Sequence, residues 1–186
     1  FTITVNDTEN PVITCPATAN LVADAGLCTS SGSIGTATGT DNCTAPTVSA
    51  SPAGPYPVGT TTVTWTATDG SGNIATCSQT VIVIDTENPV ITCPATANIT
   101  TDAGLCNSSA SIGTPTISDN CSVSASVSPA GPYALGTTTV TWTATDASGN
   151  TAICTQDVIV TDAENPVISC PADVTVSADA GLCTAR

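Results

Sequence analysis

The 186-residue sequence has no histidine, no lysine and no methionine, and its one basic residue is Arg186. The missing histidine and lysine remove most routes to acid–base catalysis, Schiff-base chemistry and imidazole–metal sites, so we do not expect an enzyme. Fifteen acidic residues against one basic residue give a net charge of −14. Because phosphate groups are bound by Lys and Arg, this balance argues against nucleic-acid binding and against attachment to anionic membranes.

Aromatic residues are scarce too, at 3% of the chain, so the large side chains that dominate most cores are few. No apolar run approaches the ~18 residues of a membrane span, and no segment resembles a signal peptide. We therefore expect no membrane insertion in this segment. If the protein is secreted or anchored, we expect the signals for it to lie outside this sequence.

Cysteine, in contrast, is abundant: the chain has ten, with no C-x-x-C pair among them. With no histidine to complete a zinc site, we interpret them as disulfides formed in an oxidising compartment. The expected location is therefore extracellular or on the cell surface.

The sequence repeats itself. DTENPVITCPATAN occupies residues 7–20 and returns unchanged at 85–98, and the related DAENPVISCPADV begins at Asp162. The later landmarks DNC, SPAGPY and TTTVTWTATD also occur twice in the same order. We predict one repeat at 7–84, a second at 85–161, the start of a truncated third at 162–186, and the last strand of a preceding repeat at 1–6. On this interpretation the chain is a window in a longer array, with the partners of Cys170 and Cys183 outside it.

Each repeat is predicted to be all-β. In TTVTWTATD the residues Val63, Trp65 and Ala67 alternate with threonines, which is the period of a strand with one buried face. Several short strands separated by turn signals favour a small Ig-like sandwich, and no stretch has helical periodicity. So thin a core needs reinforcement, and two disulfides in each repeat would supply roughly 3–4 kcal/mol each. We thus expect tandem Ig-like (fibronectin III-like) β-sandwich repeats that are stapled by disulfides.

An ordered set of motifs resembles the hyalin repeat (HYR) family: D-x-E-x-P-x-x-x-C-P, then D-N, then a block that ends in D-x-S-G-N-x-x-x-C. The first repeat carries it on Asp7, Glu9, Pro11, Cys15, Pro16, Asp41, Asn42, Gly59, Asp69, Gly72, Asn73 and Cys77, and the second repeat has the same set. The resemblance implies extracellular Ig-like modules that occur in tandem in adhesive and matrix proteins, including bacterial surface adhesins.

The resemblance also implies a disulfide pairing. Family members with two cysteines keep those of Cys-Pro and of S-G-N-x-x-x-C, which leaves the others to pair within each repeat. Cys28 and Cys43, however, could also lie at opposite ends of one strand. The expected pairs are Cys15–Cys77, Cys28–Cys43, Cys93–Cys154 and Cys106–Cys121.

Ten of the 15 acidic residues fall in the D-x-E link, the D-N pair and the D-x-S-G-N turn. In an Ig-like sandwich these three places share one pole, so they should converge where one repeat joins the next. Several carboxylate and amide oxygens are what Ca²⁺ requires, so we predict a structural calcium site at each pole. Ordinary turn chemistry is the alternative interpretation of the same motifs. The predicted ligands are Asp7, Glu9, Asp41, Asn42, Asp69 and Asn73 in the first repeat, and Asp85, Glu87, Asp119, Asn120, Asp146 and Asn150 in the second.

Two functions remain open. Near-identical units favour a stalk or filament of modules with cation-stiffened joints, joined to further repeats of the same chain and open to lateral or end-to-end self-association. The alternative is a lectin-like or receptor module that binds its ligand at the cation pole, for which Tyr56 and Tyr133 are the candidate contacts. Five N-x-S/T sequons mark potential glycosylation sites, and sugars at the second or fifth would argue against the cation: Asn6, Asn42, Asn98, Asn107 and Asn120.

Overall fold

A computed structural model of the chain describes residues 1–178, 180 and 181, and those residues contain sixteen strands and no helix. The prediction for Cys183 falls outside them. Among the described residues, no helix has the length and apolarity that a membrane crossing needs. The strands of the first repeat are β1 (Val12–Thr14), β2 (Ala19–Val22), β3 (Thr29–Ser30), β4 (Thr38–Thr40), β5 (Thr47–Ser51), β6 (Tyr56–Pro57), β7 (Gly59–Thr68) and β8 (Ile74–Ile84). Those of the second are β9 (Val90–Thr92), β10 (Ala97–Thr100), β11 (Asn107–Ser108), β12 (Thr116–Ser118), β13 (Val123–Ser128), β14 (Tyr133–Ala134), β15 (Gly136–Asp146) and β16 (Thr151–Thr161).

Each repeat is a small sandwich built on a four-stranded sheet. In the first repeat the order is β2-β8-β7-β5, with β2 parallel to β8 and the other pairs antiparallel. The pairs β1–β4 and β3–β6 complete the repeat, and β1 contacts β7 and β8. The second repeat has the equivalent order β10-β16-β15-β13, with pairs β9–β12 and β11–β14. The predicted tandem of Ig-like sandwiches is confirmed.

The core follows the threonine-spaced pattern of the long strands. On β7, Val63 and Ala67 are fully buried and Trp65 is 6% exposed, whereas the intervening threonines lie partly or fully in solvent. From β8, Val81 and Val83 enter the same cluster. Both tyrosines are buried as well, at 4% and 5% exposure for Tyr56 and Tyr133. β-branched residues fill both faces of these strands because they suit a pleated surface.

A buried glutamine ties the sheet of each repeat to two irregular segments. Gln79 is 2% exposed, and its Oε1 accepts a hydrogen bond from Trp65 Nε1 at 2.8 Å. Its Nε2 donates to the carbonyls of Ala17 and Ile34 at 2.8 and 2.7 Å. Gln156 makes the equivalent three bonds in the second repeat. Every hydrogen-bonding position of the side-chain nitrogen is used, so the polar group is buried without loss.

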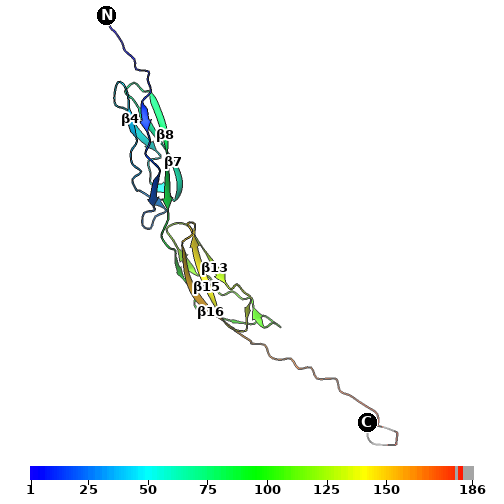
Figure 1. Ribbon diagram of the computed structural model, residues 1–186. Helices are drawn as coiled ribbons and strands as arrows, with labels where there is room; N and C mark the ends of the chain where they lie inside the picture. Colours follow the sequence, from blue (N-terminus) through cyan, green and yellow to red (C-terminus); the bar gives the residue numbers. More distant parts are fainter. Residues whose placement is uncertain (179, 182–186) are drawn as a thin grey trace.

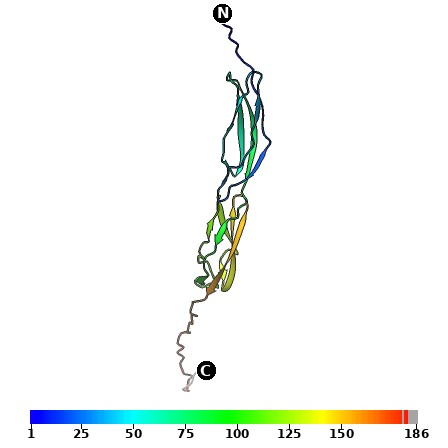
Figure 2. The same ribbon diagram turned by 90° about the vertical axis from the view of Figure 1, so that its left-hand side faces the viewer.

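The two repeats lie end to end, and the rod shape persists in both views (Figures 1 and 2). β8 of the first repeat runs directly into the link at Asp85, so the sheets follow one another along the long axis. Residues 1–6 are exposed and form no strand here, since no described strand lies beside them to pair with; the last strand of a preceding repeat stays a prediction. Residues 162–178 likewise contain no strand.

Candidate cation site and disulfide at the joint between repeats

Disulfides both close each repeat and cross from one to the other. Cys15–Cys77 and Cys93–Cys154 join the residue that follows β1 or β9 to the long last strand of the same repeat, as predicted. The other two predicted pairs, Cys28–Cys43 and Cys106–Cys121, are wrong. Cys28 instead bonds Cys121 of the next repeat, and Cys43 and Cys106 are free and exposed. The physical reason is position: Cys28 and Cys43 lie at opposite poles of the first repeat, one facing the second repeat and the other facing away.

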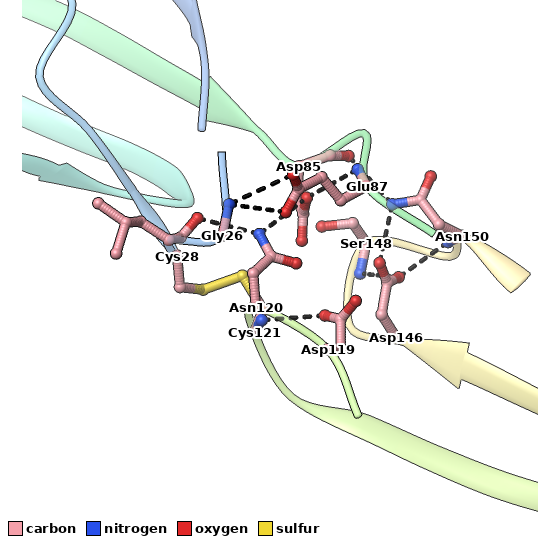
Figure 3. Close-up of a disulfide and its surroundings, with 11 residues drawn as sticks. Gly26, Cys28, Asp85, Glu87, Asp119, Asn120, Cys121, Asp146, Ser148 and Asn150 are labelled. Carbon is pink, nitrogen blue, oxygen red and sulfur yellow. Dashed lines mark hydrogen bonds between the residues drawn. A yellow bond between two sulfur atoms is a disulfide. The ribbon is translucent and has the colours of Figure 1, made fainter. Parts of the chain in front are cut away.

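The first repeat presents a tight turn to the joint. In this turn Leu27 N–H donates to the Asp24 carbonyl at 2.8 Å, and Gly26 adopts a φ of 71°, which favours glycine. The Asp24 carboxylate holds the turn by accepting from the backbone and hydroxyl of Ser31 at 2.9 and 2.7 Å. The backbone N–H of Gly26 then points across the joint and donates to both carboxylate oxygens of Glu87 at 3.0 and 3.2 Å (Figure 3).

The D-N-C loop of the second repeat contacts this turn. Asn120 Nδ2 donates to the Leu27 carbonyl at 2.9 Å and to Asp85 Oδ1 at 3.2 Å, so one side chain of the second repeat bonds both the first repeat and the link. The next residue is Cys121, whose disulfide to Cys28 lies beside these bonds (Figure 3). A disulfide, a bidentate carboxylate and an amide therefore fix one repeat to the next.

Beside the disulfide, two carboxylates converge. Oxygens of Asp85 and Asp119 and the sulfur of Cys121 lie within 4.8 Å of one another, and Asp85 is only 5% exposed. One oxygen of each carboxylate is used: Asp85 Oδ1 accepts from Glu87 N–H at 3.0 Å, and Asp119 Oδ2 from Cys121 N–H at 2.9 Å. Three other oxygens are buried with no hydrogen-bond partner among the described residues: Asp85 Oδ2, Asp119 Oδ1 and Asn120 Oδ1. Unpaired buried carboxylate oxygens are costly, so their clustering is a feature that needs a partner.

The D-x-S-G-N turn supports this cluster from the side. Asp146 Oδ1 accepts from the backbone N–H groups of Ser148 and Asn150, both at 2.8 Å, and Oδ2 accepts from Asn150 Nδ2 at 2.8 Å. Asn150 Nδ2 also donates to the Asp85 carbonyl at 3.2 Å, which anchors the link. Burial raises the pKa of the Asp146 carboxyl, but the hydrogen bonds from Asn150, Ser148 and Gly149 outweigh it and leave the pKa below its ordinary value.

The outer pole of the first repeat has the same residues in a different arrangement. Oxygens of Asp7 and Asp41 lie within 4.8 Å of the Cys43 sulfur, and Asp41 Oδ1 is buried without a partner among the described residues. Here Asn42 Nδ2 donates to Glu9 at 2.8 Å instead of reaching a neighbouring repeat. A hydrogen bond with Asp7, desolvation and the nearby carboxylates raise the pKa of the Cys43 thiol.

In this repeat the D-x-S-G-N turn matches its counterpart. Asn73 Nδ2 donates to the Asp69 carboxylate at 2.8 Å and to the Asp7 carbonyl at 3.2 Å. The pKa of Asp69 is lowered for the same reasons as that of Asp146: burial raises it, and the hydrogen bonds from Asn73, Ser71 and Gly72 lower it by more. The link and turn of the first repeat are therefore formed even without a preceding repeat.

The structure brings together most of the residues that the sequence placed at the joint. Asp85 and Asp119 bring oxygens into one cluster, Asn120 bonds Asp85 beside it and has a buried Oδ1 with no partner among the described residues, and Asn150 anchors the link through the Asp85 carbonyl. Glu9 and Glu87 do not join the carboxylate clusters, because Glu9 accepts from Asn42 and Glu87 from Gly26 across the joint. Sequence reasoning missed Gly26 as a joint residue.

Gln79 and Gln156 were missed as well. The alternation of β8 held a signal for them, since Gln79 has the same parity as the inward-facing Cys77, Val81 and Val83.

The HYR domain family matches residues 6–83 and again 84–160. The chain belongs to the HYR domain family. Its two HYR repeats together cover most of the 186 residues, and the joint described above lies at the boundary between the two matches.

Two hyalins are similar to this chain in sequence. Hyalin of Lytechinus variegatus is 36% identical over 91% of this chain, and hyalin of Strongylocentrotus purpuratus is 31% identical over all of it. The chain spans only 36% and 17% of the lengths of these two proteins. Among solved structures, the extracellular cadherin domains 1–5 of protocadherin gamma B2 align at 15% identity with a TM-score of 0.43, over 85% of this chain and 40% of that one.

Proposed function

We propose that this chain is part of an extracellular stalk or filament of HYR repeats, and that Ca²⁺ stiffens the joint between successive repeats. The observation that carries the proposal is the set of three buried oxygens at the joint, Asp85 Oδ2, Asp119 Oδ1 and Asn120 Oδ1, which lack hydrogen-bond partners among the described residues. They come from the link and from the D-N-C loop, so one bound cation would tie these two segments together.

The donor set fits a hard cation. Ca²⁺ takes six to eight oxygen ligands, and carboxylates with amide oxygens are its usual protein ligands. Asp85, Asp119 and Asn120 would hold the ion, with water and backbone carbonyls as further ligands. The Cys121 sulfur is unsuited to this role, because it is bound in a disulfide and a hard cation prefers oxygen. When bound, the ion supplies positive charge that offsets the two converging carboxylates.

Turn formation accounts for only one of the two oxygens of the Asp85 and Asp119 carboxylates. The Asx-type bonds at Asp85 and Asp119 each use one oxygen and leave the second buried. At Asp146, in contrast, the turn bonds use both oxygens, so this residue is a turn former with no free ligand atom. Within this pole, Asp85 and Asp119 are therefore proposed ligands, whereas Asp146 supports the link.

The molecule suits a structural role outside the cell. Its disulfides fit an oxidising compartment, and its near-identical repeats lie in line so that each adds length (Figure 2). The receptor alternative needs exposed aromatic contacts, but Tyr56 and Tyr133 are buried in their cores. We therefore favour the stalk over a ligand-binding module.

The test compares thermal unfolding and small-angle scattering of the chain in calcium and in chelator. A ligand at 100 times its Kd stabilises the folded state by about 2.7 kcal/mol. That corresponds to a rise in Tm of roughly 10–20 °C for a domain the size of one repeat. The scattering should show a narrower distribution of lengths in calcium, because the cation would fix the link to the D-N-C loop, which is itself bonded to the first repeat through Asn120 and Cys121.

A matched pair of variants makes the test specific. Asp119→Asn removes a proposed ligand charge, and Asp157→Asn removes one exposed charge on β16, where the carboxylate accepts a hydrogen bond from Thr139 Oγ1. We expect Asp119→Asn to abolish the calcium response and Asp157→Asn to keep it. An equal response in both variants, or none in the unchanged protein, contradicts the proposal.

A further inference from the structure

Two exposed free cysteines are the counterparts, in the other repeat, of the two cysteines that form the disulfide across the joint. The same step along the chain leads from Cys28 to Cys106 and from Cys43 to Cys121. Since Cys28 and Cys121 form the disulfide across the joint, Cys106 and Cys43 are the same two halves without their partners. Cys43 lies beside Asp7 at the outer pole of the first repeat, whereas Cys106 is two residues from Gly104, which bonds Glu164 at the far pole of the second, so they do not meet within one molecule.

The far pole of the second repeat is already shaped like the joint. The Cys106 carbonyl accepts from Leu135 N–H at 3.0 Å, as the Cys28 carbonyl accepts from Val58 N–H at 3.1 Å. Gly104 N–H donates to both oxygens of Glu164 at 2.9 and 3.0 Å, which repeats the bond of Gly26 to Glu87. The turn that carries Cys106 is thus held in the conformation in which its counterpart receives a D-N-C loop.

The outer pole of the first repeat shows the other half before docking. Asn42 Nδ2 donates to Glu9 of its own repeat at 2.8 Å, whereas the docked Asn120 donates to Leu27 of the neighbour at 2.9 Å. Glu87, the counterpart of Glu9, is bonded to Gly26 of the neighbour. The two loops therefore differ in those side chains that contact an adjoining repeat.

We propose that Cys106 and Cys43 are the two halves of a covalent joint that takes another repeat of this kind, and that a second copy of the chain supplies one. Cys106 of one copy bonds Cys43 of the next, head to tail. On docking, Asn42 turns from Glu9 to the Leu105 carbonyl, and the released Glu9 replaces Glu164 at Gly104. The proposal rests on the stalk function and adds how its units are joined: each joint is locked by a disulfide.

The chemistry needs an oxidant, and a small-molecule disulfide supplies it. The thiolate of one cysteine attacks this disulfide and releases one small thiol, which leaves a mixed disulfide on the protein. The second cysteine then attacks the protein sulfur and releases the second small thiol. One disulfide is reduced to two thiols, and two protein thiols are oxidised to the new disulfide.

Two complementary variants test the pairing in the full chain. A Cys170→Ser, Cys183→Ser background leaves Cys43 and Cys106 as the free cysteines. Within it, Cys43→Ser keeps only the turn half and Cys106→Ser keeps only the loop half. In a buffer of oxidised and reduced glutathione, we expect each variant alone to stay monomeric on non-reducing gels and their mixture to form a dimer. The background protein should form a ladder of oligomers, with the Cys43–Cys106 peptide identified by mass spectrometry after digestion at acidic residues.

Other outcomes overturn the proposal. If each variant dimerises alone as readily as in the mixture, the thiols pair without regard to the two poles. No dimer in the mixture overturns it as well. Neither result affects the calcium test, because the Cys43→Ser, Cys106→Ser protein keeps the Cys28–Cys121 joint and its carboxylates. Failure of covalent joining is therefore distinguishable from failure of the calcium-stiffened stalk.

Discussion

At the scale of single residues, Gln156 shows how a thin core fixes its loops. Its side chain satisfies Trp142 Nε1 and the carbonyls of Ala95 and Ile112, at 2.8 to 2.9 Å. Two of these partners lie in segments with no strand structure, so the glutamine does the work that a ladder of hydrogen bonds does elsewhere. Gln79 holds the equivalent place in the first repeat.

Replacing this glutamine by leucine keeps the volume and removes the bonds. We expect Gln156→Leu to lower the stability of the second repeat by about 3 kcal/mol or more, because a buried N–H and two carbonyls are left unpaired at about 1–3 kcal/mol each. Thermal unfolding monitored by tryptophan fluorescence measures it. Thr155→Val, at an exposed position next to it on β16, is the control and should change stability little. Equal stability of the two variants would show that the loops are held by other contacts.

At the scale of the structural element, the D-x-S-G-N turn between β15 and β16 depends on the charge of Asp146. Its folded-state pKa lies below the ordinary value, so the carboxylate stabilises the protein above that value. The contribution is lost as the pH falls through the lowered pKa, since the folded state then takes up the proton. Asp146→Asn removes it and turns an amide donor toward Asn150, which is itself a donor.

We expect Asp146→Asn to be less stable than the unchanged protein at pH 7, and the gap to narrow below about pH 4, where the unfolded carboxyl begins to take up protons. Urea unfolding in chelator, at several pH values between about 2 and 7, gives both curves without a cation contribution. Asp157→Asn controls for the loss of one charge on β16. A gap that stays constant across the range would show that hydrogen-bond geometry, and not charge, is what Asp146 supplies.

These elements also mark how far sequence reasoning reaches. The strands β7 and β15 follow directly from alternation, since Val63 and Trp65 share a parity that only a one-sided strand explains. The poles follow from turn motifs, which place Asp85 and Asp119 together once a sandwich is assumed. Residues 1–6 have a strand-like sequence but form none, because pairing depends on a neighbour that a local pattern does not contain.

At the scale of the whole molecule, the connection between repeats was not predictable from one repeat. The positions of Cys28 and Cys121 fit the repeat equally well whether each cysteine pairs inside its own repeat or the two pair across the joint. The spacing of the cysteines in the sequence therefore does not decide between these pairings. What decides is that the turn around Gly26 faces the next repeat, a fact of tertiary structure. Covalently, the three disulfides give the rod two routes along its length, through Cys77 and Cys93 or through Cys28 and Cys121.

These two routes make the disulfide between repeats a second tether. In the unchanged protein the stretched chain bypasses the loops closed by Cys15–Cys77 and Cys93–Cys154, of 62 and 61 residues, so full unfolding adds little length. When Cys15→Ala and Cys77→Ala open the first loop, the shortest path moves to Cys28 and Cys121. The chain then lengthens by only about 85 Å, at 3.3–3.6 Å per residue.

Removing this tether as well, with Cys28→Ala and Cys121→Ala, should raise the gain in stretched length to about 200 Å. Cys28→Ala and Cys121→Ala without the other pair should add nothing, because the path through Cys77 and Cys93 is then intact. Single-molecule stretching from the two chain ends measures all four proteins. If the gain is about 200 Å already when only the first loop is open, the joint carries no covalent load, and the Cys28–Cys121 bond is not what holds adjoining repeats under tension.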